Sequence, residues 1–229
     1  MPLSRAGLPT GTGWLDERPD LGYKDDTGQH SPGRDDGAWS SPGARRRAGA
    51  QNEAGEVEVE TWDAISSRRN VRSYQERAIA PEDLDRILEA GRRSPSAGNQ
   101  QAWDFIVCTD PEQLSRLAGV GPAAGHVAGS AATIVLVAPR SDDARTHDLI
   151  EFDLGQATMS IMLAAADLGI GSGHGGVHDQ ELARRLLGVP GDRFCGLLIA
   201  LGVPADRPLR PIGRPNRRPF TDVVHRGRW

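Results

Sequence analysis

The chain has 229 residues, of which 25% are charged and 38% are hydrophobic, and its formal net charge is −4. This length suits one domain or a small pair, and the near balance of charge argues against a nucleic-acid-binding protein, which would usually carry a basic excess. We find no run of about 18 apolar residues and expect no membrane span. The N-terminus lacks the apolar region of a secretory signal, and Cys108 and Cys195 are expected to be reduced core thiols of a cytoplasmic protein.

The first 55 residues differ from the rest, with 10 Gly, 5 Pro and only scattered large apolar side chains. Such a segment cannot bury enough apolar surface to offset the entropy cost of ordering it. We therefore expect residues 1–56 to form a disordered leader and residues 57–229 to form the folded domain. The Arg45–Arg47 run could bind nucleic acid or a partner, but a solvated triplet in a disordered leader is the simpler interpretation.

The remaining elements are expected from capping residues and from the spacing of apolar residues. A short helix starts near Thr61, and Pro81 starts another, with acidic residues at its positive end. The expected helices cover residues 62–68, 81–94, 111 onward, 146–168 and 180–187, and the expected strands cover 105–108, 134–137 and 196–201. The segment Ile161–Ala166 of the longest helix is apolar nearly all round, which implies burial on every side. Helices and buried strands thus mix in one α+β domain.

Two arginine clusters are the first candidates for a binding site. Arg68, Arg69 and Arg72 lie within five residues, and Arg217 and Arg218 form a pair near the C-terminus. Guanidinium groups are permanently charged, fork-shaped donors that suit phosphate oxygens. Arginine clusters are also common on solvated surfaces, so the clusters alone do not decide the function.

A second candidate is the segment from Ser94 to Trp103, which leaves a helix, passes through small polar residues and enters a strand. Small side chains would let a flat ligand approach the backbone, and Ser96 and Asn99 could bind the edge of that ligand. An ordinary turn would have the same composition.

The third candidate is the glycine-rich segment from Gly169 to Gly176, which we expect to be a loop. It contains the G-x-G-x-x-G spacing, but the dinucleotide fingerprint requires a preceding strand, and a long helix precedes this segment. His174 and His178 are four residues apart without carboxylate or cysteine neighbours, so no metal site is expected. A loop that offers backbone N–H groups to a ligand is the remaining interpretation.

Taken together, four motifs in order resemble the FMN-dependent nitroreductase family. They are Ser-Arg-Arg-Asn-Val-Arg-Ser-Tyr (67–74), Ser-Pro-Ser-Ala-Gly-Asn-Gln-Gln-Ala-Trp-Asp-Phe (94–105), the glycine segment after the long helix, and Arg-Arg-Pro-Phe-Thr-Asp-Val-Val (217–224). The resemblance covers residues 61–229. It implies an α+β sandwich with a central mixed sheet flanked by helices, and an intertwined homodimer with two FMN sites at its interface.

The resemblance also implies a set of FMN-binding residues, with no catalytic side chain, because the flavin carries the chemistry. One group would hold the phosphate, the ribityl chain and the pyrimidine edge: Arg68, Arg69, Asn70, Arg72, Arg217 and Arg218. Another would contact the ring: Pro95, Ser96 and Asn99, with Pro95 and Ser96 from the partner chain, and Gly173, His174 and Gly175 on the other side.

The implied activity is hydride transfer from NADPH or NADH, through flavin N5, to a nitroaromatic, quinone or other conjugated acceptor by a ping-pong mechanism. Two positions depart from the family pattern: Ala102 stands where a proline is usual, and the 171–176 segment replaces a Trp-Ile-Gly-Gly type of loop. Because that segment borders the substrate space, a specialised branch remains an alternative, acting in flavin fragmentation, dehalogenation or metabolite dehydrogenation. A non-catalytic flavin-binding protein is another.

Overall fold

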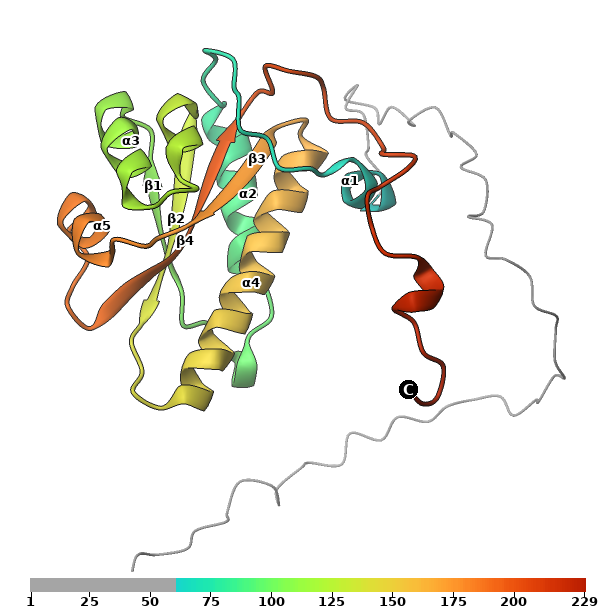
Figure 1. Ribbon diagram of the computed structural model, residues 1–229. Helices are drawn as coiled ribbons and strands as arrows, with labels where there is room; N and C mark the ends of the chain where they lie inside the picture. The colour runs from blue at the N-terminus through green and yellow to red at the C-terminus, as the bar shows by residue number, and fades with distance from the viewer. Residues whose placement is uncertain (1–60) are drawn as a thin grey trace, which may run out of the picture. The chain divides into compact units, whose positions relative to one another are not determined.

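The computed structural model of the protein describes residues 61–229, so the expected leader at residues 1–56 lies outside the described residues (Figure 1). The described part contains α-helices, strands and short 3₁₀ turns. In chain order they are α1 (Thr61–Ser67), α2 (Pro81–Arg92), η1 (Ala97–Asn99), β1 (Asp104–Cys108), α3 (Pro111–Leu117), η2 (Ala118–Val120), η3 (Gly125–Gly129), β2 (Ala132–Pro139), α4 (Ala144–Asp167), β3 (Gly171–Gly176), α5 (Gln180–Leu187), β4 (Arg193–Gly202) and η4 (Phe220–Asp222).

The helix ends follow local chemistry, as the sequence predicts. Pro81 opens α2, and the Asp110 carboxylate caps α3 by accepting a hydrogen bond from the Gln113 backbone N–H at 2.8 Å. Asp143 caps α4 in the same way, through the Thr146 N–H. Helix α5 ends at Gly188, whose φ of 67° is the left-handed conformation that glycine adopts without steric cost.

The strands form one sheet in the order β1-β2-β4-β3, and all three pairings are antiparallel. The expected parallel component of a mixed sheet is limited, within residues 61–229, to one isolated bridge between Asn70 and Ser172. The expectation of a loop at 169–176 was wrong, because residues 171–176 form the edge strand β3. This strand pairs with β4 through backbone hydrogen bonds. These bonds do not require side chains, so the glycines of β3 do not prevent the pairing.

Two cores lie on the two faces of the sheet, and helices cover both faces (Figure 1). Ile134, Leu136 and Ile199 pack toward α2 and α4, whereas the alternate residues Val135 and Leu198 pack toward α3 and α5. This alternation follows from the two-residue period of a strand. Cys108 and Cys195 are free thiols buried in the second core, as expected.

Helix α4 is the central support of the first core. Among the described residues it is the one helix long and apolar enough to cross a membrane, but half of that window is buried inside the protein, as in the core helix of a globular domain. Within the segment Ile161–Ala166 most side chains are buried by the chain itself, but Leu163 and Ala164 are half-buried, so the expected burial on every side is confirmed only in part. The exposed large apolar side chains of α4 lie earlier, at Leu149, Phe152 and Met159.

Candidate functional site

The first motif runs beside β3 as an extended segment. The Val71 N–H donates a 2.8 Å hydrogen bond to the Ser172 carbonyl. The Tyr74 hydroxyl donates to the Val71 carbonyl at 2.7 Å and lies 3.2 Å from the Ala200 carbonyl on β4. Burial raises the pKa of Tyr74 far above its ordinary value, so the phenol stays protonated and remains a donor. Tyr74 therefore fixes the motif against the sheet.

Gly173 makes this close approach possible. A Cβ at this position would lie less than 3.0 Å from the Val71 carbonyl oxygen, and 3.1 Å from both the His126 Nε2 and the Tyr74 hydroxyl oxygen. Because the nearest atom belongs to the backbone, no side-chain rotation could relieve the overlap. The ring of His126 also holds this strand, with its Nε2 at 3.1 Å from the Gly173 carbonyl oxygen.

The arginines of the motif divide between the two sides of the extended segment. Arg68 and Arg72 act on His174, whose pKa is lowered first by partial burial of its ring and then by these two positive charges. Within the described residues neither Arg68 nor Arg72 has an acidic partner within salt-bridge distance. Their charges are therefore available to an anion.

Arg69 instead contacts the C-terminal tail. Its guanidinium is paired with the Asp206 carboxylate at 2.7 Å and donates to the Arg207 carbonyl at 2.8 Å, which ties the motif to the C-terminal tail. The hydrogen bond from Arg69 holds the pKa of Asp206 below its ordinary value. The structure thus groups Arg68, Arg72 and His174 and sets Arg69 apart from them.

The second motif is held by helix α4. The Ala97 N–H lies 3.0 and 3.2 Å from the two oxygens of the buried Asp153 carboxylate. Two more side chains of α4 bind this motif. Gln156 donates a hydrogen bond to the Pro95 carbonyl at 3.4 Å, and the Ser160 hydroxyl accepts one from the Ser94 hydroxyl at 2.8 Å. Sequence analysis missed Asp153, although a carboxylate among the apolar residues 150–166 of a long helix is itself a sign of a buried polar contact.

The backbone of this motif adopts left-handed conformations at three positions. The φ angles are 58° at Gly98, 55° at Asn99 and 51° at Gln101, and the last two are unfavourable for residues with side chains. The Ser96 hydroxyl helps to hold this turn by accepting a 2.9 Å hydrogen bond from the Gln101 N–H. Ser96 and Asn99 therefore belong to a fixed turn with an exposed Asn99.

Arg217 and Arg218 lie in the exposed tail. Arg217 donates to the Asn216 carbonyl at 2.7 Å, and Arg218 donates to the Asp222 carbonyl at 2.8 Å. Among the contacts of residues 61–229 none joins this pair to Arg68 or Arg72. The tail returns to the domain at Ile212, whose N–H donates to the Ser66 carbonyl of α1 (Figure 1).

The structure thus places the sequence-derived candidates in separate groups. The turn at 95–99 is attached to the first half of α4 through Asp153, whereas Asn70 pairs with Ser172, just beyond the C-terminal end of the helix. At 1.5 Å per residue, the helix between Asp153 and Asp167 is about 20 Å long. Within one chain, the turn at 95–99 contacts the middle of α4, whereas Asn70 of the first motif pairs beyond the C-terminal end of the helix.

The residues that face His174 can hold an anion. Arg68 and Arg72, which have no acidic partner among residues 61–229, provide permanent positive charge there, and the exposed His174 adds a polar ring. The described residues contain no group of three His, Cys, Asp or Glu side chains that could hold a metal ion.

Comparison with known proteins gives this arrangement a context. The model of the nitroreductase family matches residues 65–121 and 121–203. A protein of Archaeoglobus fulgidus, assigned as NADH dehydrogenase/NAD(P)H nitroreductase, is 35% identical over 169 residues, which are 72% of this chain and 96% of the relative.

Solved structures show the same fold. An NADH oxidase from Clostridium acetobutylicum is 26% identical with a TM-score of 0.66, covering 73% of this chain and 100% of the other. An FMN-dependent nitroreductase from Clostridium difficile R20291 is 24% identical with a TM-score of 0.64, covering 72% and 98%.

Proposed function

Because the chain belongs to the nitroreductase family and is an NAD(P)H-dependent oxidoreductase, we propose that it works through one bound FMN per site in the folded domain at 57–229. When bound, FMN would take a hydride at N5 from NADPH or NADH and pass it to a nitroaromatic, quinone or other conjugated acceptor. The two reactants would use the same space in turn, which is the ping-pong scheme.

The observation that carries this proposal is a pair of cations beside a glycine-rich strand, neither of which has an acidic partner among residues 61–229. A phosphate near −2 charge and a flavin that gains negative charge on reduction both need permanent positive charge, which Arg68 and Arg72 supply. Gly173 lets the arginine-bearing motif pack directly on β3, and the exposed, neutral His174 beside these arginines can donate a hydrogen bond to the flavin or accept one from it. Asn70 would bind the ribityl chain or the pyrimidine edge.

In this proposal Arg69 and the Arg217–Arg218 pair are treated separately from Arg68 and Arg72. Arg69 is engaged by Asp206 and would hold the tail in this proposal, while its expected role at the flavin stays a prediction. Arg217 and Arg218 would reach the flavin phosphate only when the tail docks beside a site, and their present bonds to carbonyl groups leave other N–H donors free for that.

The separation along α4 supports a homodimer with shared sites. The turn that carries Pro95, Ser96 and Asn99 is held about 16–20 Å along α4 from the end where the first motif lies, so these residues would serve the site of the partner. The exposed Leu149 and Phe152 provide an apolar surface for such a partner.

The proposal is tested by purifying the protein without added flavin and recording its visible spectrum before and after addition of NADPH. We expect a yellow protein that bleaches with NADPH and releases FMN, not FAD, on denaturation. FAD in the supernatant, or no flavin after incubation with excess FMN, would contradict the proposal. Bound FMN that NADPH and NADH reduce only slowly would favour the non-catalytic alternative, and a screen of acceptors separates a general reductase from a specialised branch.

Shared sites are tested with mixed dimers that combine an Arg68→Ala/Arg72→Ala chain with a Ser96→Trp chain. One of the two sites in the mixed dimer would contain all three substitutions and the other would contain none. The mixed dimer should therefore retain up to one FMN. The two parent homodimers should bind poorly. A flavin-loaded monomer on a sizing column, or a mixed dimer as empty as its parents, would contradict the shared site.

A further inference from the structure

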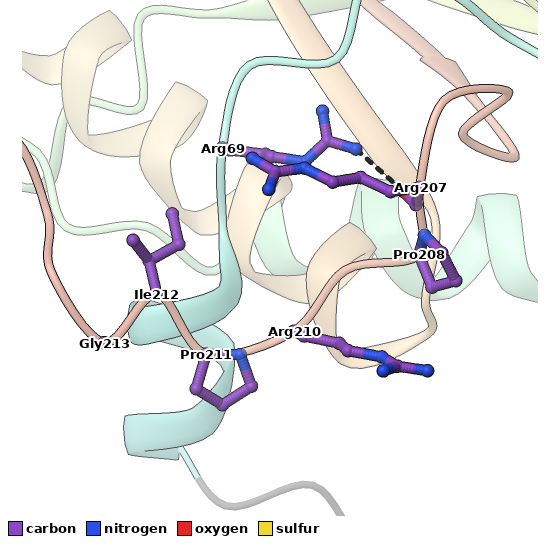
Figure 2. Close-up of a pocket in the computed structure, with 7 residues that line it drawn as sticks. All are labelled: Arg69, Arg207, Pro208, Arg210, Pro211, Ile212 and Gly213. Carbon is purple, nitrogen blue, oxygen red and sulfur yellow. Dashed lines mark hydrogen bonds between the residues drawn. The ribbon is translucent and has the colours of Figure 1, made fainter.

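A cavity of about 450 Å³ lies between the first motif and the C-terminal tail (Figure 2). Arg69 borders it from the motif, and Arg207 and Arg210 border it from the tail, together with Pro208, Pro211 and Ile212. The volume is within the range of small-molecule sites and could hold a phosphate together with part of the group that carries it.

The charges around this cavity are unbalanced. Asp206 pairs with Arg69 at 2.7 Å, but the side chains of Arg207 and Arg210 have no acidic partner among residues 61–229. Figure 2 shows the hydrogen bond from Arg69 to the Arg207 carbonyl, which joins the motif to the tail at the edge of the cavity. Arg207 and Arg210 therefore bring two positive charges to the cavity that no acidic side chain of the described residues neutralises. The cavity is therefore built to favour an anion, within a chain whose net charge is −4.

This cavity is separate from the cations of the proposed flavin site. In the extended segment, Arg68 and Arg72 act on His174, whereas Arg69, between them in sequence, turns to Asp206. Alternate residues of an extended chain point to opposite sides. The two cationic groups thus adjoin each other across one strand-like segment, and an anion in the cavity would not compete with one bound at Arg68 and Arg72.

We propose that the cavity binds a phosphate of the reductant and, through it, selects NADPH over NADH. This inference rests on the proposed function, because that function requires a second phosphate-bearing reactant beside the flavin. The shared chemistry is a phosphate ester of a nicotinamide dinucleotide. A monoester such as the 2′-phosphate of NADPH carries nearly two negative charges and three exposed oxygens, and it matches several guanidinium donors better than a diester does. The prolines and Ile212 offer apolar surface to the attached nucleoside.

The test uses FMN-loaded protein and two probes, adenosine 2′,5′-bisphosphate and adenosine 5′-monophosphate, in calorimetric titrations. We expect the bisphosphate to bind at least tenfold more tightly. The Arg207→Ala/Arg210→Ala variant should lose that preference, and its KM for NADPH should rise roughly 10- to 100-fold, as the loss of charge-assisted hydrogen bonds predicts, while its KM for NADH changes less than about twofold. The Arg207→Lys/Arg210→Lys variant should retain part of the preference, because it keeps both charges.

The matched control is Arg185→Ala, an exposed arginine on α5, which should change neither KM. Equal affinity for the two probes, an unchanged preference in Arg207→Ala/Arg210→Ala, or equal losses with NADPH and NADH would each overturn the inference. Loss of FMN from this variant would also overturn it, because the cavity would then serve the flavin phosphate. Protein that binds no FMN and yet prefers the bisphosphate would refute the proposed function while supporting the phosphate site.

Discussion

Replacing Gly173 by alanine is the sharpest test of how the candidate site is assembled. The new Cβ would lie less than 3.0 Å from the Val71 carbonyl oxygen, closer than side-chain atoms and backbone oxygens normally approach. The overlap can be relieved only if the Arg68–Arg72 motif and β3 move apart. Such a movement would stretch the 2.8 Å hydrogen bond from the Val71 N–H to the Ser172 carbonyl.

The expected cost can be worked out from these contacts. One or two hydrogen bonds would weaken, at about 1 kcal/mol each, and the residual overpacking would add about 1–3 kcal/mol. We therefore expect Gly173→Ala to lower the free energy of unfolding by about 2–5 kcal/mol. For a folded domain of this size, the melting temperature should fall by roughly 4–20 °C. FMN affinity should fall as well, because Arg68 and Arg72 are displaced.

Gly176→Ala on the same strand is the matched control. Its Cβ would meet only the His178 ring, at 3.7 Å, which is an ordinary contact. Removing glycine from a strand position without a clash should leave stability unchanged or raise it by up to about 1 kcal/mol. Urea unfolding followed by circular dichroism, at one protein concentration and with FMN content measured alongside, compares the two variants. If Gly173→Ala matches the wild type, or if both variants lose the same stability, the close approach of the motif is not what requires glycine.

The other predictions concern single polar groups. Asp153→Asn should lower the free energy of unfolding by about 1–3 kcal/mol and weaken FMN binding, because an amide cannot accept from the Ala97 N–H with both atoms; an unchanged urea midpoint and FMN affinity would contradict this. The lowered pKa of His174 means that the unfolded chain takes up more protons than the folded one as pH falls through the ordinary value of 6.5, so stability is lost on acidification. His174→Gln should therefore lose less stability than the wild type between about pH 7 and pH 5 in thermal melts. Arg217→Ala should mainly weaken FMN affinity, by about 1.5–3 kcal/mol, whereas Arg72→Ala should also shift the flavin reduction potential; purely affinity-based losses in both would refute this division.

The elements that the sequence predicted well are those whose causes are local. Asp110 caps α3 and Gly188 ends α5 through bonds and backbone angles made within a few residues, so the sequence pattern carries the information. The second half of α4 was also predicted correctly, because its continuous apolar surface requires cover whatever the topology. The four motifs identified the family because each combines unusual residues in a fixed order.

The strand β3 and the role of Arg69 could not be predicted in the same way. A strand of Gly, Ser and His shows no alternation of apolar side chains, and its partner β4 lies more than fifteen residues away in the chain. The pairing of Arg69 with Asp206 joins residues 137 positions apart, so it depends on the path of the tail over the domain. Asp153 belongs to the same class, since its partner Ala97 lies 56 residues earlier.

The position of Gln156 on α4 links the turn at 95–99 to the surface that a partner would cover. Leu149, Phe152, Gln156 and Met159 follow one another at intervals of three and four residues, which places them along one side of the helix. Gln156 binds the Pro95 carbonyl, so a partner packed on this side would press on the turn as it buried the apolar residues. Flavin binding and dimerisation should then be coupled, because each stabilises the arrangement that the other requires. FMN release on serial dilution, followed by the rise of free flavin fluorescence, should depend on protein concentration and coincide with the appearance of monomer on a sizing column. Release of FMN at the same fraction at every protein concentration would show that one chain holds the flavin without its partner.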